Sequence, residues 1–285
     1  MTAGTGIIYT IESKKTAAAP RQQDGNIDMD LNKSKKHINK YTHKERYSLI
    51  DTLRGLALVN MIVYHAVWDL VYMFGMDWAW YRSDAAYVWQ QGICWTFILL
   101  SGFCIPLGRR TVKRGLIVFA AGAVITAATA IAVPRDMVLF GVLTLIGSCM
   151  LLISPMKRLL CRIDPVLGLI VSFGLFFLTR NINEGHLGFE SLRFAELPDA
   201  LYSNMITAYL GFPPPGFHST DYFPLLPWIF LFVCGYFIYY IFEKYDLLKY
   251  LRSKRSNPLE AIGRSTLLIY MIHQPVLYLI FELIL

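Results

Sequence analysis

Seven apolar segments, separated by shorter polar stretches, follow residue 45 of the chain. Each is long enough to cross a bilayer as a straight or tilted helix, and the fifth is the shortest. The pattern predicts an all-α protein, a polytopic transmembrane helical bundle of about seven spans. The segments cover approximately residues 48–73, 86–107, 113–133, 137–155, 165–179, 222–243 and 259–285.

The composition indicates a membrane protein rather than a soluble or nucleic-acid-binding one. The 285 residues are 55% hydrophobic and 16% charged, with a mean hydropathy of +0.43, whereas soluble domains contain about 25% charged residues. The net charge of +7 comes from basic residues between the apolar segments, which a positive-inside bias explains. We therefore expect the lipid bilayer as a partner and no nucleic acid.

The distribution of Lys and Arg predicts the orientation. Residues 1–45 are polar and basic, so we expect a disordered cytoplasmic tail followed by a transmembrane domain over residues 46–285. Loops that would lie opposite the tail carry only Arg82, Arg135, Arg180 and Arg193, and the basic clusters fall in the other loops. Because positive loops stay cytoplasmic, the N-terminus is expected inside and the C-terminus outside, in a multi-pass protein of the cell membrane.

The first apolar segment contains four ionisable residues: Asp51, Arg54, His65 and Asp69. Arg54 and His65 are 11 residues apart, which places them on one helical stripe about 16 Å apart. One interpretation is structural, with an Asp51–Arg54 ion pair and a His65–Asp69 pair between helices. The other is functional, because an imidazole near a carboxylate can act as a general base.

A metal site is not expected. Two candidate ligands on one helix are too few for a metal ion. The five cysteines lie in or beside apolar segments without paired metal-ligand spacing.

The last apolar segment contains a second membrane histidine, His273. If helices begin at Ile50 and Leu259, His65 and His273 lie at nearly the same depth, about 21–22 Å from their inner starts. A packed core histidine would explain either one alone. Two at matched depth on different helices favour a shared polar chamber.

The longest predicted external connection runs from about residue 180 to 221 and is rich in aromatic residues and proline. A disordered connector is one interpretation, but this composition favours an ordered cap. Asp221 at its end precedes a helix start that carries two prolines. Asp221 is therefore a further candidate site residue.

The second segment ends in the small residues Ser101 and Gly102, which allow close helix packing, and is followed by a cluster of cations. Topology and lipid headgroup contact explain these cations well. Alternatively, they bind the phosphates of a cytoplasmic cofactor, because arginine binds phosphate oxygens bidentately. The cluster, which we call the basic turn, comprises Arg109, Arg110, Lys113 and Arg114.

The chain resembles the membrane-bound acyltransferases related to the catalytic domain of heparan-alpha-glucosaminide N-acetyltransferase. Five stretches in order carry the resemblance, and together they cover nearly everything after the tail. They are DTLRGLA from Asp51 with His65, FILLSG from Phe97, FGVLTLIG from Phe140, DYFPLLPW from Asp221 and GRSTLLIYMIHQP from Gly263.

The resemblance implies an acetyl-CoA-dependent N- or O-acetyltransferase. The acetyl group would pass from cytoplasmic acetyl-CoA to an amine or hydroxyl of an extracytoplasmic sugar or glycan. His65 and His273 would be catalytic, with Asp69 or Asp221 orienting one of them. The chain departs from the family at Thr144, where members often carry histidine. Acetyl-CoA would be bound near Asp51, Arg54, Ser101, Arg109, Arg110, Lys113 and Arg114.

Two other classes compete with the acyltransferase. A proton-coupled secondary transporter would also bury ionisable residues at mid-depth, but transporters usually show internal repeats, and no convincing repeat occurs in this sequence. A non-catalytic scaffold would need no polar stripe. The identity of the acceptor and the formation of a homo-oligomer are left open by the sequence.

Overall fold

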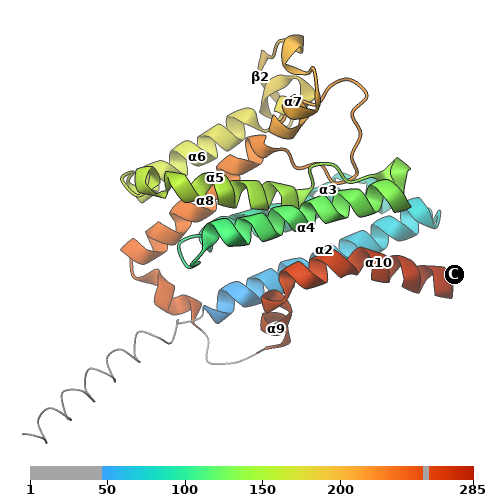
Figure 1. Cartoon of the computed structure of the whole chain (residues 1–285), viewed down its shortest axis with the longest axis horizontal. Helices are drawn as coiled ribbons and strands as arrows, with labels where there is room; N and C mark the ends of the chain where they lie inside the picture. The colour runs from blue at the N-terminus through green and yellow to red at the C-terminus, as the bar shows by residue number, and fades with distance from the viewer. Residues whose placement is uncertain (1–46, 253–256) are drawn as a thin grey trace, which may run out of the picture. The chain divides into compact units, whose positions relative to one another are not determined.

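The computed structural model describes residues 47–252 and 257–285. The predicted tail, with Lys33, Lys35, Lys36, Lys40 and Lys44, lies outside the described residues. The predicted helical bundle is confirmed (Figure 1). Its helices are α2 (Ser48–Trp68), α3 (Asp84–Phe103), α4 (Thr111–Ala132), α5 (Val142–Leu160), α6 (Pro165–Thr179), α7 (Met205–Leu210), α8 (Leu225–Lys244), α9 (Pro258–Arg264) and α10 (Thr266–Ile284).

Within the described residues, six helical stretches are long and apolar enough to cross a membrane. They are Ser48–Met73, Thr111–Ala132, Val142–Leu160, Pro165–Glu184, Leu225–Lys244 and Thr266–Ile284. The remaining predicted span forms α3, which has 20 residues and lies below this hydropathy because its first half carries Gln90 and Gln91. About seven spans is therefore consistent with the structure.

The helices form one connected bundle. Helix α2 contacts α3, α9 and α10, α4 contacts α5, and α8 contacts α3, α5 and α6. Figure 1 shows α2 and α10 side by side along one edge of the bundle, with α4 and α5 next to them. The largest core cluster lies between α3, α5, α6 and α8, with Leu145, Phe176 and Phe232 among its buried residues. Most of the apolar burial is thus concentrated away from α2 and α10.

The expected ordered cap is confirmed. Residues 180–221 contain the 3₁₀ turns Ile182–Glu184 and Asp199–Leu201, the antiparallel strands β1 (His186–Phe189) and β2 (Leu192–Glu196), and the short helix α7. Buried Arg180 ties the cap to α3, because its guanidinium donates to the Tyr87 hydroxyl at 2.9 Å and to Gln91 at 3.2 Å. The bundle thus has a cap end and, at the other end, the basic turn.

The last predicted span, 259–285, is not one helix, which corrects the prediction. It divides at Ser265 into α9 and α10, so Leu259 is not the start of the helix that carries His273. The break allows α9 to cross α2 very closely. A Cβ on Gly263 would lie 1.8 Å from the Asp51 carbonyl oxygen, and one on Gly55 would lie 1.9 Å from that of Leu259. Backbone contact at this crossing, rather than a continuous span, determines where α10 begins.

Helices α3 and α8 also meet through glycine. A Cβ on Gly102 would lie 1.9 Å from the Phe232 carbonyl oxygen, and one on Gly235 would lie 2.1 Å from that of Leu99. Small residues at such positions let the backbones of membrane helices approach each other. The prediction that Gly102 permits close packing is therefore confirmed.

We predict that Gly235→Ala destabilises the bundle by about 1–3 kcal/mol, because the added methyl group overlaps a backbone carbonyl that cannot move aside alone. Thermal unfolding in detergent measures the change. Gly174→Ala is the matched control, because nothing lies within 4 Å of the Cβ position of Gly174 in α6. Equal unfolding temperatures for the two variants would contradict this account of the α3–α8 contact.

Candidate active site

Helices α2 and α10 place His65 and His273 beside each other, with ring centroids 5.1 Å apart. The two helices run in the same direction, because residues that follow His65 along the chain contact residues that follow His273. The Gln274 amide donates to the Asp69 carboxylate, and the rings of Phe74 and Tyr278 contact each other at a tilt, with centroids 5.9 Å apart. The predicted juxtaposition of the two histidines at one depth is therefore observed.

The hydrogen bond of His273 defines its tautomer. Its Nδ1 lies 2.6 Å from the backbone carbonyl oxygen of Tyr270, and because a carbonyl can only accept, Nδ1 carries the proton. The lone pair of the neutral ring is then on Nε2. That atom is buried and has no hydrogen-bond partner among the described residues. His273 is thus held by one nitrogen, and the other is left free to accept a proton or attack a carbon atom.

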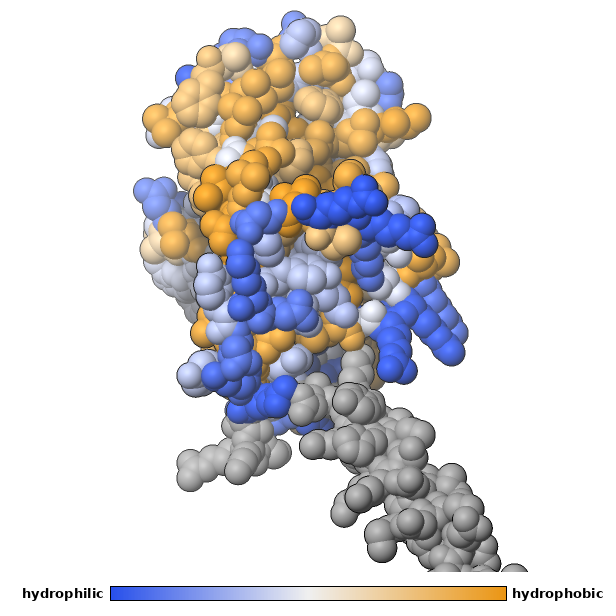
Figure 2. Space-filling view, turned by 90° about the vertical axis from the view of Figure 1, so that its left-hand side faces the viewer, coloured by the Kyte–Doolittle hydropathy of each residue, from blue (hydrophilic) through white to orange (hydrophobic). Residues whose placement is uncertain are grey.

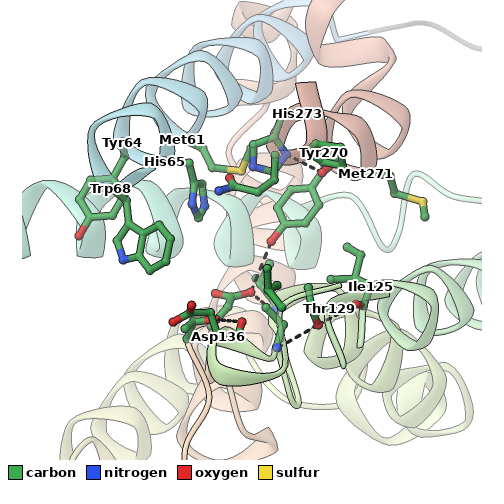
Figure 3. Close-up of a pocket in the computed structure, with 18 of the residues that line it drawn as sticks. Met61, Tyr64, His65, Trp68, Ile125, Thr129, Asp136, Tyr270, Met271 and His273 are labelled. Atoms are coloured by element: carbon green, nitrogen blue, oxygen red, sulfur yellow. Dashed lines mark hydrogen bonds between the residues drawn. The ribbon is translucent and has the colours of Figure 1, made fainter. Parts of the chain in front are cut away.

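A cavity of about 780 Å³ lies between the histidine-bearing helices and the α4–α5 pair. Figure 3 shows His65, His273 and Tyr270 on one wall and Thr129 and Asp136 on the opposite one. Aromatic side chains form much of the histidine wall, including Tyr64 and Trp68. This volume is within the range of small-molecule sites, so a polar ligand group can meet both imidazoles here.

Asp221 lies in the wall of this cavity, opposite the histidines. Its Oδ2 accepts from the Val142 amide at 3.3 Å and from the Tyr270 hydroxyl at 3.5 Å. Removal from water raises the pKa of the Asp221 carboxyl to about 6, against the opposing effect of these hydrogen bonds. Asp221 therefore neighbours the site through Tyr270 and contacts neither imidazole.

Asp69 does not pair with His65, so the structural interpretation of that pair is wrong. The Asp69 side chain is fully buried, and it accepts from Gln274 on α10 instead. A carboxylate one helical turn from a histidine can instead accept a hydrogen bond from a neighbouring helix when that helix offers a better donor. The expected orienting contact, from Asp69 or Asp221 to a histidine, is not among the described interactions.

Sequence reasoning missed Tyr270 and Gln274. Tyr270 precedes His273 by one helical turn, and Gln274 directly follows it in an apolar helix. A polar residue at such positions in a membrane helix needs a partner, and this signal could have identified both. Thr144, where the family often has histidine, lines the far wall of the cavity, and its hydroxyl lies against Gly122.

At the other end of α2, Asp51 and Arg54 form the predicted ion pair, with 3.2 Å between Arg54 Nη1 and Asp51 Oδ1. Arg264 of α9 lies 4.0 Å from the same carboxylate and also pairs with buried Glu260. The structure thus gives Arg54 a carboxylate partner. It does not bring Arg54 into the cavity that contains the histidines.

The residues of the basic turn are exposed at that same end of the bundle, where hydrophilic side chains gather (Figure 2). Its four cations have no carboxylate within ion-pair distance among the described residues, whereas Lys244 pairs with Asp164 at 2.9 Å. Ser101 lies in the last turn of α3 and is half-buried. The candidate residues therefore divide into two groups, one at the cavity and one at the basic end.

Comparison with known proteins matches the chain to a family. Residues 46–275 match the family described as "Heparan-alpha-glucosaminide N-acetyltransferase, catalytic". No curated protein and no solved structure matches the chain significantly. The matched residues include both histidines and most of the spans, and they make up well over half of the chain. The chain therefore belongs to the family of the heparan-alpha-glucosaminide N-acetyltransferase catalytic domain.

Proposed function

We propose that this multi-pass membrane protein transfers an acetyl group from cytoplasmic acetyl-CoA to an amine or hydroxyl of a sugar or glycan on the other side of the membrane. The observation that carries the proposal is the pair of imidazoles in the cavity wall, 5.1 Å apart, in a member of an acetyltransferase family. His65 and His273 are the proposed catalytic residues.

The free Nε2 of His273 suits either of two routes. In direct transfer, Nε2 accepts the proton of the acceptor while the acceptor attacks the thioester carbonyl, and the imidazolium gives that proton to the departing CoA thiolate. In covalent transfer, an imidazole nitrogen attacks the thioester and expels the CoA thiolate. The acceptor then attacks the acetyl carbonyl, the imidazole leaves, and the proton of the acceptor passes to the thiolate. In both routes the thioester supplies the free energy for acetyl transfer, and no further energy source is needed on the outer side of the membrane.

The basic turn is the proposed binding site for the phosphates of acetyl-CoA. Exposed arginines without carboxylate partners are free to bind phosphate, whereas Arg54 must first exchange Asp51 for it. We place Arg54, Asp51 and Ser101 near the path of the donor rather than at its phosphates. The donor thus enters at the end of the bundle opposite the cap, consistent with a cytoplasmic basic end.

We predict that His65→Ala and His273→Ala each lower the rate of acetyl transfer by about 10²- to 10⁴-fold, because general-base assistance contributes that much. Thermal stability and acetyl-CoA binding should stay near wild type. His218→Ala is the matched control, since His218 is exposed in the cap and does not line the cavity. A normal rate in either membrane-histidine variant would show that this histidine is structural.

We expect the acetyl group, and not CoA, to cross the membrane. In sealed vesicles of known orientation, acetyl-CoA should act only from the side of the basic turn, and the acceptor only from the side of the cap. Radiolabelled acetyl groups appearing on the acceptor measure the reaction. Activity with both substrates confined to one side would disprove this arrangement.

Replacing Arg109 and Arg110 by Gln is expected to weaken acetyl-CoA binding, and the loss should shrink as salt rises, because exposed charges are screened. Isothermal titration at two salt concentrations measures the effect. Replacing Arg158, in the last turn of α5, and Arg162, in the connection to α6, by Gln is the control, because it removes equal charge away from the basic turn. If both double variants bind acetyl-CoA like wild type, the basic turn only sets the topology.

A further inference from the structure

The cavity opens sideways between α4 and α10. Ala128 and Ala132 of α4 line the cavity and are exposed rather than buried. Tyr278 and Leu279 of α10 also line it, with exposed fractions of 40% and 59%. Cavity-lining side chains that keep this much accessible surface lie where the cavity is open rather than enclosed. Figure 3 shows Ile125 of α4 and Met271 of α10 on its two sides.

This opening lies at the depth of the membrane hydrocarbon. Both helices are candidate spans. Ala128 is four residues before the end of α4 and Leu279 is five before the end of α10, so each lies about 6–8 Å inside the helix end. Lipid chains rather than bulk water therefore surround the rim on this side.

The polarity of the cavity changes from one end to the other. Asp136 and Thr220 line it at the cap end, and the imidazoles lie deeper in its wall. The rim between α4 and α10 has methyl groups and aliphatic side chains, including those of Ala128 and Leu279. A soluble glycan would contact only the polar part of the cavity, whereas an amphiphile would contact the polar part with its head group and the apolar rim with its chain.

We propose that the acceptor is an amphiphile held in the outer leaflet, with a sugar head group in the cavity and its hydrocarbon chain leaving between α4 and α10. This proposal rests on the proposed acetyl transfer and adds the chemical class of the acceptor. The small side chains of Ala128 and Ala132 leave room for the chain, and the bilayer holds the head group near the histidines.

The first test measures acetyl transfer in nanodiscs to dodecyl β-glucosaminide and to methyl β-glucosaminide. Ala128→Phe fills the rim, and Ala127→Phe is the matched control, because Ala127 is exposed on α4 but does not line the cavity. We expect Ala128→Phe to raise the KM ratio of dodecyl to methyl substrate about tenfold, since overpacking a binding groove is worth about that factor. The control should keep the wild-type ratio. Because all three proteins are compared by the same ratio, the different partitioning of the two substrates into the bilayer cancels. Equal ratios in all three proteins would overturn the proposal.

The second test needs no catalysis. A dodecyl glucosaminide with a diazirine on its chain is photocrosslinked to the wild-type protein, and the labelled peptides are mapped by mass spectrometry. Label concentrated on α4 and α10, and displaced by unlabelled dodecyl glucosaminide but not by dodecylphosphocholine, supports the proposal. Displacement by both shows an ordinary annular lipid, and label spread over all spans shows no groove; either result overturns it. Specific crosslinking without any acetyl transfer would contradict the proposed reaction while retaining the groove.

Discussion

The site depends on one buried hydrogen bond, from Gln274 of α10 to Asp69, which begins the π-helical turn Asp69–Met73 that continues α2. An ionisable group in a membrane helix is costly unless it is partnered, and Asp69 has no exposed surface at all. This requirement fixes how far α10 is displaced along α2. Because His273 directly precedes Gln274 and His65 lies one turn before Asp69, the same register places the two imidazoles 5.1 Å apart.

A second constraint is the crossing of α9 over α2 at Gly55 and Gly263, where no side chain fits. It begins α10 next to the Asp51–Arg54 pair and adds Arg264 to that cluster. The charges there largely neutralise one another. Cations without carboxylate partners are therefore found in the basic turn rather than on α2.

The sequence was sufficient for the helices and for the pairing of His65 with His273, because apolar length and depth along a helix are local properties. The predicted depth of His273 assumed one continuous span, however, and the helix breaks at Ser265. This break depends on backbone contact between α9 and α2, which the hydrophobic pattern of the sequence does not indicate. The partner of Asp69 was missed for a similar reason, since a side chain chooses its donor in three dimensions. A shared polar chamber at the two histidines was predicted, but its opposite wall was not, because that wall depends on which face α4 turns toward α10.

That face is determined by the contacts of α4 with α5. Gly122 lies against Thr144, and Gly115 lies against Met150 and the carbonyl oxygen of Gly147. The small residues on this side of α4 therefore pack against α5. On the other side, α10 is held to the segment that continues α2, by the hydrogen bond from Gln274 to Asp69 and by the contact between the rings of Phe74 and Tyr278. Each helix pair is thus fixed internally, and neither needs tight packing between α4 and α10. In water, such a gap would collapse to bury its apolar rim, but in a bilayer the lipid chains solvate the rim equally well. A cavity between two separately stabilised helix pairs can therefore persist without a ligand, and it can admit one from the side without breaking either pair.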